Sequence, residues 1–185
     1  MGPDFVLMSD PVAPFDHMEA MTVGRELGKL GFLWYEEPIH DYDMYGYKQL
    51  ADALDIAVAA CEWNAGKYFT AAQFIQARAA DIIRSDPSWK GGFTGFLKTA
   101  HLCEAYGMNC EVHAGCTPLM DVANLHAACA IKNCRYLELS IEEDSFGLMA
   151  GVSPDEDGLV TAPTDLGLGV ELEWDTLRSS AVAEL

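Results

Sequence analysis

Positive charge is scarce in this sequence. Its 185 residues include 11 lysines and arginines against 29 aspartates and glutamates, which gives a formal net charge of −18 at pH 7. The phosphates of nucleic acids and the surfaces of anionic membranes repel a protein with this balance. We therefore expect neither nucleic acid nor a membrane among its partners.

Long apolar runs are missing as well. No stretch approaches the roughly 18 consecutive apolar residues that a membrane-spanning helix requires. The first residues also lack the basic and then apolar pattern of a secretory signal. We therefore expect a cytoplasmic protein that is neither anchored nor exported.

The cysteines do not form any Cys-x-x-Cys pair, and several of them lie within apolar segments. There are six, at positions 61, 103, 110, 116, 129 and 134. This distribution is typical of reduced thiols in a protein core and not of a disulfide framework or a zinc site.

The remaining composition is that of an ordinary soluble domain, with 50% hydrophobic and 22% charged residues. The length is sufficient for one substantial core. Residues 1–140 alternate apolar runs with helical patterns, whereas residues 141–185 are rich in turn-forming residues. We expect a single domain over residues 1–185, in which the C-terminal tail packs on the repeated units or on a cap.

Three acidic residues each close an apolar run that is typical of a short β-strand. Asp10, Glu36 and Glu62 follow one another at equal intervals of 26 residues, and a helical pattern fills each interval. Parallel strands in such strand-helix units bring the three carboxylates together at their C-terminal ends. Because close carboxylates repel one another unless a cation neutralises them, we predict a site for a hard divalent ion such as Mg²⁺. The three runs are residues 5–10, 32–38 and 56–62.

The same alternation continues along the chain and predicts three further strands. Every strand is mostly apolar, which indicates a parallel sheet with both faces covered. The fold class is therefore α/β, a partial TIM-type (β/α)₈ barrel of about six units. Thr70 is a plausible helix N-cap, and residues 167–172 could form a short edge strand. The later strands are predicted at 81–86, 108–113 and 135–139, and the helices at 15–30, 47–54, 70–79, 93–106 and after 114–118.

Two of the later strands end in residues that could carry chemistry. Asp86 precedes the glycine pair Gly91 and Gly92, which allows a close approach of backbone to a ligand. His113 follows Asp86 after 27 residues, one further strand-helix unit. Without Asp86 in this place, His113 would be interpreted as a packed core histidine.

At this point the sequence resembles the catalytic barrel of the enolase superfamily, in particular its mandelate racemase subgroup, which contains many acid-sugar dehydratases. The resemblance covers nearly the whole chain. It implies a (β/α)₈ barrel closed by an N-terminal capping domain, with Mg²⁺ as the cofactor. It rests on Asp10, on Glu36 within Glu36-Glu37-Pro38, on Glu62, on Asp86 ahead of Gly91-Gly92, on His113, and on Glu138 within Tyr136-Leu137-Glu138-Leu139.

The resemblance also implies a role for each matching residue. Asp10, Glu36 and Glu62 would bind Mg²⁺, whose charge stabilises the enediolate formed by removal of a proton next to a carboxylate. His113 would be the general base, and Asp86 would fix its tautomer and raise its basicity. Glu138 would donate a hydrogen bond to the substrate carboxylate, which requires a desolvated and protonated side chain.

The sequence also departs from the family pattern at two single positions. Val12 stands where the family often has asparagine, two residues after the first ligand, so the support around the ion could differ. Trp89 stands where related subgroups carry a catalytic lysine, and Lys90 is one residue out of step. Trp89 is then either a wall of the substrate pocket or simply packing.

A larger departure concerns what precedes Asp10. If its strand is the third of the family barrel, two strands and the capping domain are missing, and an open arc of strands leaves exposed edges. We therefore expect a fragment or truncated reading frame, unless homo-oligomerisation or a separate N-terminal segment completes the barrel.

The sequence as a whole predicts Mg²⁺-dependent removal of an α-proton from a small hydroxy-carboxylate, as the first step in the dehydration of an acid sugar by a lyase. Two alternatives remain open. One is a racemase or epimerase of an α-hydroxy acid. The other is a catalytically inactive barrel fragment or assembly module.

Overall fold

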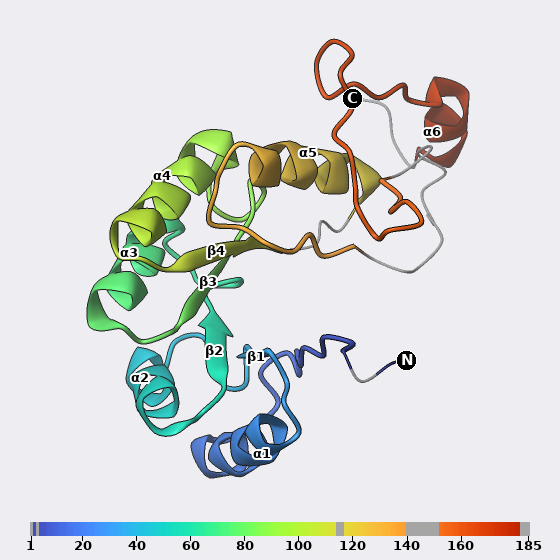
Figure 1. Cartoon of the computed structure of the whole chain (residues 1–185). Coiled ribbons are helices and arrows are strands. Elements are labelled where there is room, and N and C mark those ends of the chain that lie inside the picture. The colour runs from blue at the N-terminus through green and yellow to red at the C-terminus, as the bar shows by residue number, and fades with distance from the viewer. Residues whose placement is uncertain (1, 3, 114–116, 140–151, 182–185) are drawn as a thin grey trace.

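The structure is a computed structural model that describes residues 2, 4–113, 117–139 and 152–181. Helices and strands alternate through most of this range, as Figure 1 shows. The helices are α1 (His17–Lys29), α2 (Met44–Ala53), α3 (Tyr68–Ala77), α4 (Gly92–Ala105), α5 (Pro118–Cys129) and α6 (Trp174–Ser180), and the strands are β1 (Trp34–Glu36), β2 (Ala57–Ala60), β3 (Ile82–Ser85) and β4 (Asn109–Val112).

The four strands form one parallel sheet in the order β1-β2-β3-β4. Two isolated parallel bridges extend it on either side, one between Ser9 and Tyr35 and the other between Val112 and Leu137. Six parallel segments therefore lie side by side in the predicted order, which confirms the α/β class. The outer two are single bridges and not the full strands predicted at 5–10 and 135–139.

The helices begin and end where local chemistry favours it. Asp16 and Glu19 form a reciprocal capping box at the start of α1, so two backbone N–H groups without helical partners are satisfied. Asp43 accepts from the backbone N–H of Gly46 and starts α2 earlier than predicted. Pro118 occupies the first turn of α5, where its missing N–H costs nothing.

Two local predictions were wrong. Thr70 lies inside α3 and donates its hydroxyl to the carbonyl of Ala65, while Lys67, at φ 57°, is the N-cap. Residues 167–172 form no strand, and the described tail instead turns at Gly167 and Gly169 before α6. Apolar alternation alone could not reveal that this segment has no neighbouring strand to pair with.

The hydrophobic core lies between the sheet and the helices that pack against it. Val58, Ile83, Phe74 and Phe96 are all almost completely buried. Complete burial of a side chain of this kind stabilises the fold by about 1.5–3 kcal/mol. The core thus fixes the ends of neighbouring strands relative to one another, which is the requirement for a site built from several strands.

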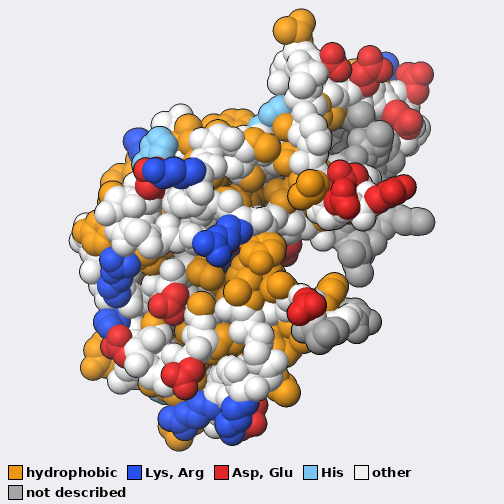
Figure 2. All heavy atoms as spheres, in the orientation of Figure 1, with side chains coloured by type: hydrophobic (Ala, Val, Ile, Leu, Met, Phe, Trp, Pro, Cys, Tyr) orange, Lys and Arg blue, Asp and Glu red, His pale blue; other side chains and the backbone are white. Residues whose placement is uncertain are grey.

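The surface agrees with the composition. Figure 2 shows many of the acidic side chains of this face on the C-terminal tail, at the upper right, and the lysines and arginines mainly over the helices. The described cysteines are all free thiols, and Cys61, Cys103 and Cys110 are buried as predicted. Cys129 is instead exposed and Cys134 is half-buried, while Cys116 lies outside the described residues. No helix in the described part of the chain is long and apolar enough to cross a membrane.

Candidate active site

The sequence-predicted site residues lie at one edge of the sheet. Glu36 is the last residue of β1, Glu62 follows β2, Asp86 directly follows β3 and His113 directly follows β4. Asp10 and Glu138 each follow the bridge residue of an outer segment, Ser9 and Leu137. Since all six parallel segments run in one direction, their C-terminal ends meet here.

Three carboxylates form the centre of the site. Asp10, Glu36 and Glu62 each offer an oxygen, and these atoms all lie within 4.8 Å of one another. Glu36 and Glu62 are buried, whereas Asp10 is exposed. Although the residue as a whole is exposed, partial desolvation of its carboxyl group by neighbouring atoms, and then the nearby charge of Glu62, raise the pKa of Asp10. Burial also raises the pKa of Glu36, although the guanidinium of Arg84 opposes this.

This donor set fits a hard divalent cation. Carboxylate oxygens are the ligands that Mg²⁺ prefers, and close carboxylates have raised pKa values because no positive charge balances them fully. The protein holds two of them in place: the backbone N–H of Val12 donates to Asp10 Oδ1 at 3.1 Å, and the indole N–H of Trp34 donates to Glu36 Oε2 at 3.0 Å. Asp10, Glu36 and Glu62 would therefore hold the ion.

An arginine inside the sheet takes part in the same cluster, although the sequence did not predict a role for it. Arg84, in β3, is 1% exposed and pairs with both Glu36 and Glu138. It also donates to the carbonyl of Val112 at 3.0 Å, and its guanidinium lies 5.7 Å from the Trp34 ring centroid. A charged residue within an otherwise apolar strand was the available signal, because buried charges need partners.

Glu138 does not match the expectation of a desolvated hydrogen-bond donor. Its carboxylate pairs with Arg84, and its side chain is 42% exposed. The expectation came from the family resemblance and required a desolvated, protonated carboxyl group at the end of the sixth segment. The arginine two strands away supplies a charged neighbour instead.

His113 lies between two carboxylates. Its Nε2 atom is 3.0 Å from Glu62 Oε1, and its Nδ1 atom is 3.6 Å from Asp86 Oδ2. Asn124 of α5 donates to the backbone carbonyl of His113 at 2.7 Å. Burial alone lowers the pKa of His113, but the contacts with Asp86 and Glu62 outweigh it and raise this pKa to about 10.

Asp86 is completely buried and is held by its own turn. Its Oδ1 atom accepts from the Ser88 hydroxyl and, at 2.8 Å, from the Trp89 backbone N–H. Burial alone raises the pKa of Asp86, but these contacts and His113 lower it below its usual value. The aspartate is therefore a fixed negative charge beside Nδ1 of the imidazole.

A pair of tryptophans adjoins the histidine through Trp63. The ring centroids of Trp63 and Trp89 are 5.3 Å apart, and that of Trp63 is 6.4 Å from His113. Trp89 is 41% exposed, so it could still form a wall of a pocket. Lys90 is completely buried, and its ammonium donates to the carbonyl of Glu62 at 2.9 Å, behind the carboxylate cluster.

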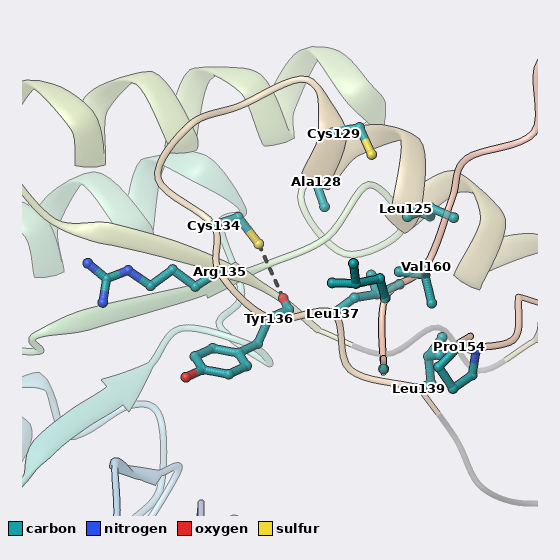
Figure 3. A pocket seen from close by; sticks show the side chains of 12 residues that line it. Leu125, Ala128, Cys129, Cys134, Arg135, Tyr136, Leu137, Leu139, Pro154 and Val160 are labelled. Atoms are coloured by element: carbon teal, nitrogen blue, oxygen red, sulfur yellow. Dashed lines mark hydrogen bonds between the residues drawn. The ribbon is translucent and has the colours of Figure 1, made fainter. Parts of the chain in front are cut away.

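A cavity of about 510 Å³ lies elsewhere, between α5, the sixth segment and the tail. Figure 3 shows Leu125, Leu137 and Val160 pointing into it from these three parts of the chain. Its lining is mainly apolar and holds none of the predicted site residues. Next to it, His126 of α5 and the Leu168 carbonyl of the tail are 3.1 Å apart, so this region joins the tail to α5.

The fold and the site together define an α/β protein with a carboxylate cluster and a histidine at the C-terminal ends of parallel strands. Residues 1–176 match the sequence family described as Enolase C-terminal domain-like. The chain therefore belongs to this family.

The chain is similar in sequence and structure to several named enzymes. The chain is 33% identical over 113 residues to an L-talarate/galactarate dehydratase of Salmonella typhimurium, covering 61% of this chain and 28% of that protein. It is 30% identical over 187 residues to a D-galactarolactone cycloisomerase of Agrobacterium fabrum, covering 96% and 49%. A crystal structure of D-glucarate dehydratase from Agrobacterium tumefaciens complexed with magnesium matches with a TM-score of 0.86 at 38% identity, covering 96% of this chain and 47% of that chain.

The chain thus spans less than half of the length of each of these relatives. The relatives are enzymes of the enolase superfamily, and the neighbours in structure have TIM-type barrels.

Proposed function

We propose that this protein takes part in the Mg²⁺-dependent dehydration of an acid sugar. The observation that carries the proposal is the contact between His113 and the carboxylate cluster, which places a base 3.0 Å from a candidate metal ligand. The names of the dehydratases among the relatives, and the magnesium in one related structure, support the choice of reaction and ion.

Each residue of the site has a separate role in this proposal. A divalent cation, when bound, supplies positive charge that stabilises the enediolate formed from the substrate carboxylate and its α-carbon. Asp10, Glu36 and Glu62 would hold this ion. His113 takes the α-proton at Nε2, the nitrogen that faces the cluster, while Asp86 keeps the other nitrogen protonated.

The second half of the reaction returns the same proton. The bond between the β-carbon and its hydroxyl group breaks, the hydroxyl leaves with the proton from Nε2 of His113, and the enol product then becomes a keto acid. The net change is loss of one water, and His113 ends in its starting state. One histidine serves both steps when the α-proton and the hydroxyl leave from the same side.

Proton exchange and product analysis test the proposal. The full-length protein is incubated with Mg²⁺ in D₂O and a panel of acid sugars, and NMR follows deuterium at the α-carbon and formation of the 3-deoxy-2-keto acid. We expect a keto acid from at least one compound and none with His113→Asn. α-Deuterated starting material without a keto acid would favour the racemase or epimerase alternative, and the absence of both α-exchange and keto acid with every compound would contradict proton abstraction.

A further inference from the structure

A second cavity, of about 390 Å³, is lined by residues of the turns that follow the carboxylate cluster. Its lining includes Val12, Glu37 and Trp63, which follow the three candidate metal ligands by one or two residues. The cavity therefore borders the turns at the C-terminal ends of the strands that carry the ion site. Trp63 connects the two, because its ring also lies 6.4 Å from His113.

The outer wall of this cavity is the loop that follows β1. The Nδ1 atom of His40 lies 2.9 Å from Asp41 Oδ1, and the imidazole stacks on the Tyr42 ring with centroids 4.6 Å apart. Asn64 donates to the Asp41 carbonyl at 2.9 Å, which fixes the loop to the segment that carries Trp63. Aromatic faces combined with a few polar groups are typical of a small-molecule site.

The charge of the lining distinguishes between substrate types. Asp41 and Glu37 line this cavity, and the described lining residues include no lysine or arginine. Glu37 is buried, and its oxygens accept from the Tyr47 hydroxyl at 2.8 Å and from the Glu62 backbone N–H at 3.0 Å, which leaves Asp41 as the carboxylate nearest to a ligand. The imidazole of His40 already pairs with Asp41. A second carboxylate placed here would meet negative charge without a cation to balance it, whereas hydroxyl groups could bond to the acidic and phenolic oxygens and pack on the rings.

We propose that this cavity binds the neutral, hydroxylated end of the substrate, so that the protein prefers acid sugars with one carboxylate (aldonates) over those with two (aldarates). The inference rests on the proposed function, since it requires the substrate carboxylate at the ion site and the α-carbon at His113. The remaining carbons of the substrate then extend along Trp63 toward the loop of residues 40–42.

Paired substrates test this preference directly. D-galactonate and D-galactarate differ only in their last carbon, which is a CH₂OH group in the first and a carboxylate in the second. With the full-length protein and Mg²⁺, we expect kcat/KM for turnover, followed as keto-acid formation together with α-proton exchange, to be at least about tenfold higher for the aldonate, as for one unbalanced charge in a partly shielded pocket.

Two variants assign the preference to this cavity. Asp41→Asn removes one negative charge at nearly constant shape. It should therefore raise kcat/KM for the aldarate about fivefold to tenfold relative to kcat/KM for the aldonate. Tyr42→Ala should raise KM for the aldonate severalfold. The matched controls are Asp52→Asn and Tyr45→Ala, which change the same groups on α2 outside the cavity. They should leave kcat/KM and KM unchanged for both substrates.

The outcomes separate the two levels of the proposal. Turnover of the aldarate with an equal or higher kcat/KM, or an unchanged ratio of the two kcat/KM values in Asp41→Asn, would overturn the assignment of the cavity while the proposed function stands. The absence of both α-exchange and keto-acid formation with every acid sugar would overturn both.

Discussion

The Nε2 atom of His113 lies closer to Glu62, at 3.0 Å, than its Nδ1 atom does to Asp86, at 3.6 Å. The candidate base therefore contacts a candidate metal ligand directly. A proton on Nε2 and a cation at the cluster then compete for the same carboxylate. The acid-base chemistry of the histidine and the affinity for the metal are consequently linked.

We expect this link to appear in the titration of His113. In the metal-free protein the contacts with Asp86 and Glu62 outweigh burial and raise the pKa of His113 to about 10. Mg²⁺ bound at Glu62 should lower this pKa toward the usual value near about 6.5. NMR titration of the ring protons with and without Mg²⁺ measures the shift. An unchanged pKa at saturating Mg²⁺ would show that the ion does not bind beside this histidine.

The same raised pKa predicts how stability depends on pH. Since the pKa of His113 is higher in the folded than in the unfolded state, its protonation stabilises the fold fully below about pH 6.5. This contribution is lost as the pH rises toward the folded pKa of about 10. Denaturant unfolding of the metal-free protein should show a decrease over this window. His113→Asn should show a smaller decrease in the free energy of unfolding over the same pH range. Equal decreases in the wild type and the variant would show that His113 is not the group responsible.

Replacement of Glu62 tests the ion site. Glu62→Gln preserves size but removes one of three negative charges, so the affinity for Mg²⁺ should fall by about one to two orders of magnitude or more. Calorimetric titration with Mg²⁺ measures it. Glu26→Gln is the matched control, because Glu26 lies on the surface of α1 and pairs with Lys29. Equal affinity in the wild type and Glu62→Gln would mean that Glu62 does not bind the ion.

Arg84 predicts a coupling between metal and stability. Arg84→Met removes the guanidinium that balances Glu36 and Glu138, so the free energy of unfolding should fall by roughly 3 kcal/mol, as for a broken buried ion pair. Mg²⁺ should recover part of this loss by supplying the missing charge. Thermal unfolding with and without Mg²⁺ measures both effects, and Arg25→Met on exposed α1 controls for loss of charge. A larger Mg²⁺-induced stabilisation in the wild type than in Arg84→Met would refute the coupling.

The sequence predicted the parallel order of the six segments and the gathering of the site residues, because both follow from the period of strand-helix units. Asp10, Glu36 and Glu62 needed only this period to be placed together. Arg84 was not predicted, because its partners lie 48 and 54 residues away and nothing near it in sequence identifies them. The bridges at Ser9 and Leu137 were expected as strands, since apolar alternation does not show how much of an edge segment finds a pairing partner.

The last prediction concerns the base itself. His113→Asn removes a positioned proton acceptor, so turnover should fall by roughly three orders of magnitude or more while the protein remains folded. Asp86→Asn should act in the same direction but less strongly, because it disturbs the tautomer without removing the imidazole. The two losses should not add, since the residues act as one unit. His101→Asn, on the exposed side of α4, is the control. Near-normal turnover per folded molecule of His113→Asn would show that this histidine is structural, and the proposed mechanism would then have no base.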